Sequence, residues 1–266
     1  MTLPISPNSI SLDQVNTELV ITSGTRIALN DTPVRTLFVK PTGTISLSDG
    51  YGKSYDFIPA PITADVQNLN LRTWALSQGW DGTRRVIVTI NSGVTIGSNN
   101  TSSAALTIDG TWPRGVKLIN NGLIIGCGGK GGNNDTNGSP GGTALLVSTA
   151  TDIENTFGTI GGGGGGGGGG ASGSYTVSGK YGDTVYYYTG AGGGGGQGYL
   201  PGAGGTGVPN GSPGTKNAGG TGGNGAGSGG GLGAAGSLGG GAGGPAVSGN
   251  AYVNWISTGN RLGALV

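Results

Sequence analysis

Six of the nine tyrosines lie between residues 171 and 200, on a background of glycine, serine and threonine. They are Tyr175, Tyr181, Tyr186, Tyr187, Tyr188 and Tyr199, and the charged residues among them are Lys180 and Asp183. Tyrosine brings a large amphipathic contact area at low entropic cost and is typical of adaptable recognition loops. Because consecutive tyrosines in an extended strand cannot all face inward, we interpret this segment as a recognition surface. Packing of the rings over neighbouring glycines is the alternative.

Three further polar stretches are expected to form loop tips beside the tyrosines, because loop tips carry recognition residues. The first, residues 133–140, begins with Asn133, Asn134 and Asp135. The second, residues 197–201, contains Gln197 and Tyr199, and the third is residues 208–217. Asparagine and aspartate oxygens could ligate calcium, but we interpret residues 133–135 as a hydrated loop and predict no metal site.

The residue types argue against catalysis. The chain has no histidine, which removes the usual general base and metal ligand. Cys127 is the only cysteine, so neither a cysteine nucleophile with its histidine partner nor an intrachain disulfide is expected. The acidic residues show no paired spacing of the glycosidase kind, and the many G-x-G-x-x-G matches follow from composition. We therefore predict a protein that is not an enzyme and uses no cofactor.

The charge and hydropathy patterns exclude other partners. The 13 basic residues nearly balance the 12 acidic ones, and charged residues make up only 9% of the chain. No basic patch indicates nucleic-acid binding. No apolar run of about 18 residues indicates membrane insertion, and the N-terminus lacks the pattern of a signal peptide.

Glycine accounts for 65 of the 266 residues and is concentrated between residues 161 and 244. Ordering one backbone residue costs roughly 1–2 kcal/mol, whereas a hydrogen bond returns about 0.5–1.5 kcal/mol, so nearly every amide must be paired. Glycine disfavours α-helix and weakens ordinary sheet. Extended three-fold helices lying side by side satisfy the amides, and we predict such a polyglycine-II sandwich. A flexible linker is the alternative.

An eight-residue repeat predicts a β-scaffold. Residues 90–97 match residues 119–126 position by position, and weaker copies occupy 154–161 and 256–263. Each copy reads as a strand end, an Asn/Gly turn, a second strand and a glycine exit. Such units stack because none can bury its own apolar face, which favours a solenoid-like scaffold. The glycine-rich segments are insertions that leave the scaffold after Gly126 and after Ile160.

A second repeat occupies the N-terminal residues. Its three copies share an Ile-x-Leu pattern, formed by Ile10, Leu12, Ile27, Leu29, Ile45 and Leu47. We predict a short strand in each copy, with helical turns capped by Asp13 and Asp31. Units of this size cannot bury a core alone, so we expect them to dock on the rest of the chain, on copies of themselves or on a partner.

These features predict a mainly β and polyglycine-II chain in four parts. Residues 1–60 form a small docking module with short strands and helical turns, and residues 61–126 form one helix, near residues 70–78, plus the β-scaffold. Residues 127–245 form the glycine-rich domain, with scaffold strands at 143–160. Residues 246–266 return to the scaffold as C-terminal strands.

Three stretches resemble phage tail proteins. The N-terminal repeats, with Asp31-Thr32-Pro33-Val34-Arg35 and Gly50-Tyr51-Gly52-Lys53-Ser54, resemble the leader module of tailed-bacteriophage tail proteins. Residues 69–129, through Trp74-Ala75-Leu76 and Gly79-Trp80-Asp81-Gly82, resemble phage tail and fibre proteins with glycine-rich C-terminal domains. Residues 161–244 resemble the polyglycine-rich part of the fibre-tip adhesins of T-even-like phages, which recognise outer-membrane receptors.

This resemblance implies a receptor-binding protein of the virion, at the tail or fibre tip, made in the host cytoplasm. Its tyrosine-rich loops would bind a bacterial surface receptor, either protein or glycan. The apolar residues of the N-terminal repeats would dock on other tail or fibre proteins, with a homotrimer left open. A structural tail or baseplate component is the first alternative. An ice-binding protein is the second, although the irregular loops argue against the flat face that it needs.

Overall fold

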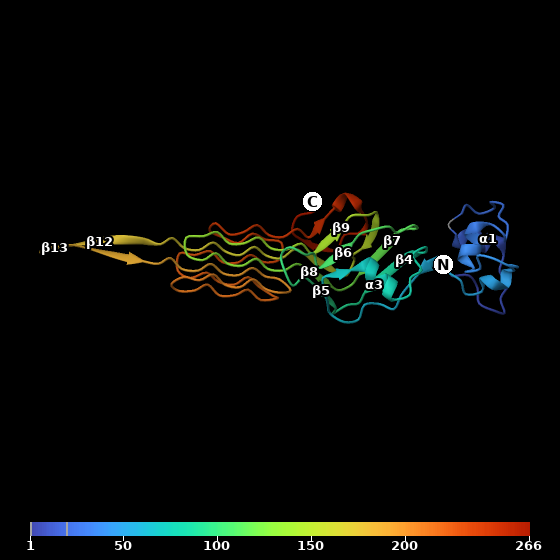
Figure 1. The fold of residues 1–266 in the computed structure, drawn as a ribbon, viewed down its shortest axis with the longest axis horizontal. Helices are drawn as coiled ribbons and strands as arrows, with labels where there is room; N and C mark the ends of the chain where they lie inside the picture. Colours follow the sequence, from blue (N-terminus) through green and yellow to red (C-terminus); the bar gives the residue numbers. More distant parts are fainter. Residues whose placement is uncertain (1, 20) are drawn as a thin grey trace.

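The computed structural model describes residues 2–19 and 21–266 of an elongated molecule. Figure 1 shows an N-terminal module at one end, then a β-scaffold, then a bundle of extended glycine-rich segments, and a thin hairpin at the other end. The glycine-rich segments and the hairpin are therefore held away from the N-terminal module by the scaffold. In the described part of the chain, no helix is long and apolar enough to cross a membrane.

The scaffold is built from three parallel sheets. The first contains β1 (Asp56–Phe57), β4 (Arg85–Ile90), β7 (Val116–Asn120), β10 (Thr151–Glu154) and β15 (Val253–Ser257). The second contains β2 (Val66–Gln67), β5 (Thr95–Gly97), β8 (Leu123–Ile125), β11 (Thr159–Gly161) and β16 (Asn260–Leu262). The third contains β3 (Leu69–Asn70), β6 (Leu106–Ile108), β9 (Leu145–Val147) and β14 (Val247–Ser248).

The chain visits these sheets in turn, so each circuit makes one rung of a solenoid. All four copies of the eight-residue repeat form the corner between the first and second sheets, which confirms the rung-like scaffold. The strand register departs from the sequence match at the first copy, since Ile90 pairs with Asn120 and not with Ile119. Burial sets this register, because it places Val88 beside Leu118, and both side chains face the core.

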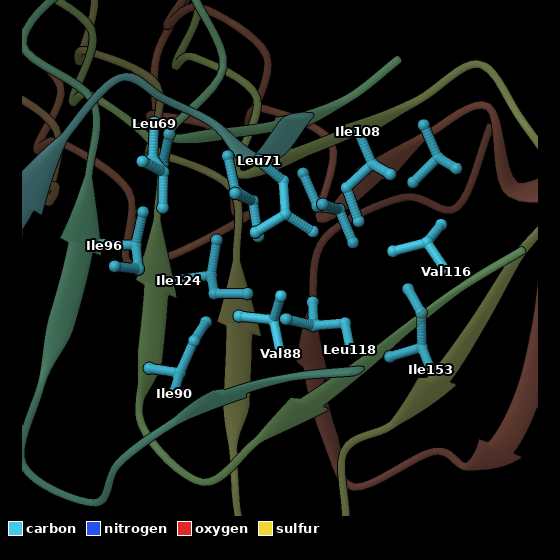
Figure 2. Close-up of a cluster of buried hydrophobic side chains, with 14 of the residues drawn as sticks. Leu69, Leu71, Val88, Ile90, Ile96, Ile108, Val116, Leu118, Ile124 and Ile153 are labelled. Carbon is cyan, nitrogen blue, oxygen red and sulfur yellow. The ribbon is translucent and has the colours of Figure 1, made fainter. Parts of the chain in front are cut away.

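The core lies between the three sheets. Figure 2 shows apolar side chains from successive rungs, among them Val88, Leu118 and Ile153, pointing into the same interior. Two fully buried amides, Asn120 and Asn155, form a rung-to-rung hydrogen bond of 2.7 Å at the repeat corner. Helix α3 (Leu71–Ser77) covers this core as predicted, with Asn70 as its N-cap and Gly79 in the left-handed region just beyond its end.

The glycine-rich segments are inserted between the second and third sheets, after β8 and after β11. Their backbone hydrogen bonds repeat every three residues. Gly163, Gly166 and Gly169 donate to Gly142, Ser139 and Thr136 on one neighbouring segment. Gly164, Gly167 and Gly170 donate to Gln197, Gly194 and Ala191 on a second, and Gly165 and Gly168 donate to Ala234 and Ser237 on a third. One run of glycines is thus bonded to neighbours on three sides.

The N-terminal module corrects part of the prediction. Its elements are α1 (Leu12–Glu18), α2 (Thr32–Leu37) and a 3₁₀ turn η1 (Leu47–Gly50). None of the described residues of the three Ile-x-Leu repeats forms a strand, because each repeat runs directly into a helical turn. The predicted cap at Asp13 is wrong, since Ser11 caps α1. Asp31 is the N-cap of α2, but its side chain makes no capping hydrogen bond.

The module joins the scaffold through a short, polar connection. Asp56 in β1 accepts two hydrogen bonds from Arg85 in β4, at 2.6 and 2.8 Å. The guanidinium of Arg114 lies 4.7 Å from the ring centre of Tyr55. These contacts are suited to orienting the module on the first sheet of the scaffold.

The remaining elements are β12 (Gly173–Gly179), β13 (Gly182–Tyr188) and a 3₁₀ turn η2 (Asn250–Tyr252). Strands β12 and β13 pair with each other in antiparallel register and form a separate two-stranded sheet. This hairpin leaves the bundle of glycine-rich segments at the end opposite to the scaffold (Figure 1).

Candidate functional site

The tyrosine-rich segment is a projecting hairpin rather than a loop. Its seven residue pairs run from Gly173 with Tyr188 to Gly179 with Gly182, so Lys180 and Tyr181 form a two-residue turn. Every residue from 174 to 188 is exposed. A two-stranded sheet without a covering layer is marginally stable in water, so the hairpin is suited to gaining stability from a partner.

One face of the hairpin carries most of its aromatic surface. Tyr175 and Tyr186 are directly opposite each other and stack with ring centres 5.2 Å apart. Tyr188 lies on the same face over Gly173, where a side chain would collide with the tyrosine ring. Val177 extends the same apolar strip toward the turn. Each of these four side chains remains about half exposed, so the strip is an open apolar surface.

The other face and the turn are more exposed and more polar. Tyr187 is 83% exposed, and it shares this face with Val185 and Asp183 of β13. At the turn Tyr181 is 96% exposed, and the ammonium of Lys180 lies 5.8 Å from its ring centre. Hydroxyls, a carboxylate and an ammonium therefore surround the aromatic strip, which suits a surface that makes both apolar and polar contacts.

The loop of Asn133, Asn134 and Asp135 supports the base of the hairpin. Asp135 accepts a hydrogen bond from the N–H of Ser172 at 2.6 Å, and Asn134 donates to the hydroxyl of Ser172 at 3.4 Å. Hydrogen bonding by Ser172, through its side chain and its N–H, holds the pKa of the Asp135 carboxyl below its usual value. Asn133 accepts from the N–H of Thr206 at 3.0 Å and so links a further loop to this end.

A shallow recess lies beside the hairpin base. Tyr187 and Tyr188 line it from the hairpin, and Val208 and Asn224 line it from two other loops of the glycine-rich region. Val208 is 70% exposed. The predicted stretch 208–217 therefore reaches this end through its first residue, whereas Asn224 was not among the predicted residues.

Gln197 and Tyr199 lie at the other end of the glycine-rich segments, beside the scaffold. The side chain of Gln197 bridges the carbonyl of Lys216 and the N–H of Leu232. Tyr199 packs against Gly97 of β5, and the ammonium of Lys216 lies 4.3 Å from its ring centre. The structure therefore does not bring these two residues together with the hairpin.

The six apolar residues of the N-terminal repeats lie mostly inside their own module. Ile10 is buried, and Ile27, Leu29, Ile45 and Leu47 are half-buried against the same cluster, which includes Val15 and Phe38. Leu12 is more open, at 39% exposed. Most of the repeat therefore fills a small core and is not free to contact another protein.

The acidic side chains and the single thiol are scattered over the described part of the chain. Among residues 2–19 and 21–266, no cluster of three or more histidine, cysteine, aspartate or glutamate side chains could hold a metal ion. The thiol of Cys127 is buried between the scaffold and the glycine-rich segments, and burial raises its pKa. A thiol held in the neutral form is a poor nucleophile.

Sequence reasoning found the hairpin residues but not their conformation. The signal was present, because β-branched and aromatic residues, at 175–177 and 184–188, lie on both sides of Gly179-Lys180-Tyr181-Gly182. The contacts of Ser172 at the hairpin base and the position of Asn224 beside the recess had no such signal, since both arise from segments far apart in the sequence.

Comparisons with known proteins place this geometry in context. The model of the family described as phage tail fibre adhesin Gp38 matches residues 58–266. A solved chain of the gp37–gp38 adhesin tip complex of the bacteriophage S16 long tail fibre superposes with a TM-score of 0.57. The two sequences are 28% identical, and the match covers 88% of this chain and 91% of that one. A search of curated proteins found no match.

Proposed function

The chain belongs to the phage tail fibre adhesin Gp38 family, and from this premise we propose which parts of it contact the host and which contact the virion. It is an adhesin of the tail fibre tip and not an enzyme. Receptor binding is therefore the function that we assign below to particular residues, in preference to a purely structural tail component or an ice-binding protein.

The receptor-binding surface in this proposal is the hairpin β12–β13 with the loops at its base. The observation that carries it is the exposed aromatic strip of Tyr175, Tyr186 and Tyr188 at the end of the molecule farthest from the N-terminal module. Tyrosine is enriched among the few residues that contribute most of the binding energy at protein interfaces. The exposed turn residues Lys180 and Tyr181 belong to the same surface, with Asp183 and Tyr187 on its other face. Asn133, Asn134 and Asp135 act from the hairpin base.

The glycine-rich segments act in this proposal as a rigid spacer of polyglycine-II helices. A helix with three residues per turn directs successive amides toward three neighbours, which is the hydrogen-bond pattern of residues 163–170. A rigid support lowers the entropic cost of presenting the hairpin to a receptor.

The N-terminal module, residues 1–60, is the proposed virion-docking part. The S16 adhesin is named as a complex of gp38 with gp37, and we assign the equivalent fibre subunit as the partner of this chain. The module lies at the end opposite to the hairpin, which leaves the receptor surface free when the module is bound. Of the six repeat residues, Leu12 is the exposed candidate for that contact, because the others support the core of the module.

The test is adsorption of purified protein to susceptible bacteria. We expect the wild type to bind and to block phage adsorption, and the variant with Tyr186, Tyr187 and Tyr188 changed to serine to lose both activities. Tyr252→Ser is the control, because Tyr252 is about half exposed on the scaffold and far from the hairpin. Circular dichroism checks that each variant folds.

Equal binding by the triple variant and the wild type would refute the assignment of the tyrosines. Binding by neither protein, together with recovery of binding in an assembled fibre, would show that the receptor surface needs the fibre subunit as well.

A further inference from the structure

The free edge of β12 is an unused hydrogen-bonding surface. Among the described residues, no backbone hydrogen bond links residues 174–188 to any part of the chain outside the hairpin. Strand edges that remain open in this way pair readily with another polypeptide strand, and proteins usually protect them with charge, proline or a covering element.

The geometry of the turn identifies the open groups. In a hairpin with a two-residue turn, the flanking pair, here Gly179 and Gly182, is a hydrogen-bonded pair. Pairs then alternate along the ladder, so the N–H and C=O of every second residue point outward. On β12 the outward groups belong to Ser174, Thr176 and Ser178.

The two edges of the hairpin differ in protection. Strand β12 contains no charged residue and no proline, and its outward positions carry small hydroxyl side chains. The outward positions on β13 are Asp183, Val185 and Tyr187, so this edge carries a carboxylate and a large ring. Charge and bulk discourage pairing at an edge, whereas short hydroxyl side chains allow close approach.

We infer that β12 binds the receptor by strand addition, in which an extended segment of a surface protein pairs with Ser174, Thr176 and Ser178. This inference rests on the proposed function of the hairpin and makes the receptor a polypeptide rather than a glycan. Main-chain hydrogen bonds supply affinity in this mode, and side chains on the two faces supply specificity. The strip of Tyr175 and Val177 then extends across the added strand.

The test removes one outward N–H from each edge. Thr176 and Val185 face each other across the ladder, so Thr176→Pro and Val185→Pro delete matched donors that the hairpin itself does not use. Binding to intact cells of a susceptible strain is measured for both variants and for Thr176→Ala, which keeps the N–H. Cross-strand nuclear Overhauser effects check that the hairpin is intact, and Val177→Pro, which removes a ladder donor, shows the signature of a broken hairpin.

We expect Thr176→Pro to weaken binding about tenfold, a factor that corresponds to roughly the free energy of one hydrogen bond. Val185→Pro and Thr176→Ala should stay within about twofold of the wild type. Equal binding by both proline variants would overturn strand addition, as would loss confined to Val185→Pro, or binding to purified lipopolysaccharide from the same strain. Wild-type dimers that Thr176→Pro makes monomeric would also overturn it, because a second copy would then occupy the edge.

A final variant separates this inference from the proposed function. Replacing residues 174–187 by two glycines removes all of the hairpin except its first and last residues, Gly173 and Tyr188. If that variant loses binding while an intact Thr176→Pro hairpin keeps it, the hairpin is the receptor site but binds by its side chains. If the shortened variant still binds like the wild type, the proposed function fails as well.

Discussion

Replacing Gly166 with alanine should disrupt the glycine-rich segments from within. Gly166 is buried, its N–H donates to Ser139 at 2.9 Å, and its carbonyl accepts from Gly241 at 2.8 Å. A methyl group at this position would fall on the carbonyl of Lys130, closer than the 3.0 Å that real side chains respect. The obstacle is backbone, so no side-chain rotation can relieve it and the segments must move apart.

The size of the effect follows from two losses. Overpacking of a filled interior costs about 1–3 kcal/mol. Displacing Gly166 also weakens its two backbone hydrogen bonds, each worth about 0.5–1.5 kcal/mol. The smaller entropy of alanine in the unfolded chain returns about 0.4–1 kcal/mol. We therefore expect a net loss of roughly 2–4 kcal/mol and a fall in the melting temperature of about 5–10 °C.

The matched control is Gly231→Ala. A methyl group there would lie 3.4 Å from the side chain of Gln197, which is an ordinary contact, and the backbone of Gly231 is not in the left-handed region. Differential scanning calorimetry of both variants provides the comparison. Melting of Gly166→Ala within about one degree of Gly231→Ala would refute the claim that glycine is required because the segments touch backbone to backbone.

Three further predictions concern particular polar contacts. Asn155→Ala removes the hydrogen-bond partner of the buried Asn120 amide, at 2.7 Å, and of the Thr258 carbonyl, at 2.9 Å, so it should lower the free energy of unfolding by about 2–4 kcal/mol. Chemical denaturation measures this loss, with Asn254→Ala at an exposed position as the control, and an unchanged midpoint would contradict the prediction. Asp56→Ala removes the carboxylate that pairs with Arg85, so limited proteolysis should cleave the segment between the N-terminal module and the scaffold faster than in the wild type. Cleavage at the wild-type rate would contradict this prediction. The pKa of Asp135 is lowered in the folded state, so its contacts with Ser172 stabilise the hairpin base at pH values above the ordinary aspartate pKa, and this stabilisation is lost as pH falls through the lowered pKa. The amide resonance of Ser172 should therefore shift in acid in the wild type but not in Asp135→Asn. An identical titration of this resonance in both proteins would exclude this role.

The solenoid scaffold could be predicted from the sequence because the residues that specify each corner are close together in the chain. Alternating apolar residues, an Asn/Gly turn and a glycine exit recur at each corner, and such units must stack to bury their apolar faces. The register of the first copy was not readable from the motif. It depends on which residues of β4 face the core, and matching Ile90 to Ile119 would have set an inward residue against an outward one.

The glycine-rich segments were approached by elimination rather than by pattern. The need to pair every amide favoured bundled three-fold helices, and the three-residue period of the hydrogen bonds around residues 163–170 supports that proposal. The choice of neighbours could not be derived, because glycine carries no side chain that distinguishes one neighbour from another. The positions of Gln197 and Tyr199 at the scaffold end follow from that choice, and sequence proximity to the tyrosines was misleading.

The N-terminal repeats were misread for a different reason. The Ile-x-Leu pattern fits a strand over three residues, but Ser11 and Gln14 form a capping box that begins a helix at Leu12. A capping interaction competes directly with extension of a strand, and the short pattern gave too little evidence of periodicity to decide between them.

The central claim is that one end of this adhesin contacts the host while the other end is held by the virion. The direct measurement uses phage that carry the variant in which two glycines replace residues 174–187. The account predicts virions with the normal amount of adhesin that adsorb to susceptible cells only at background level. Normal adsorption by these virions, or loss of the adhesin from the particles, would contradict the assignment of the two ends.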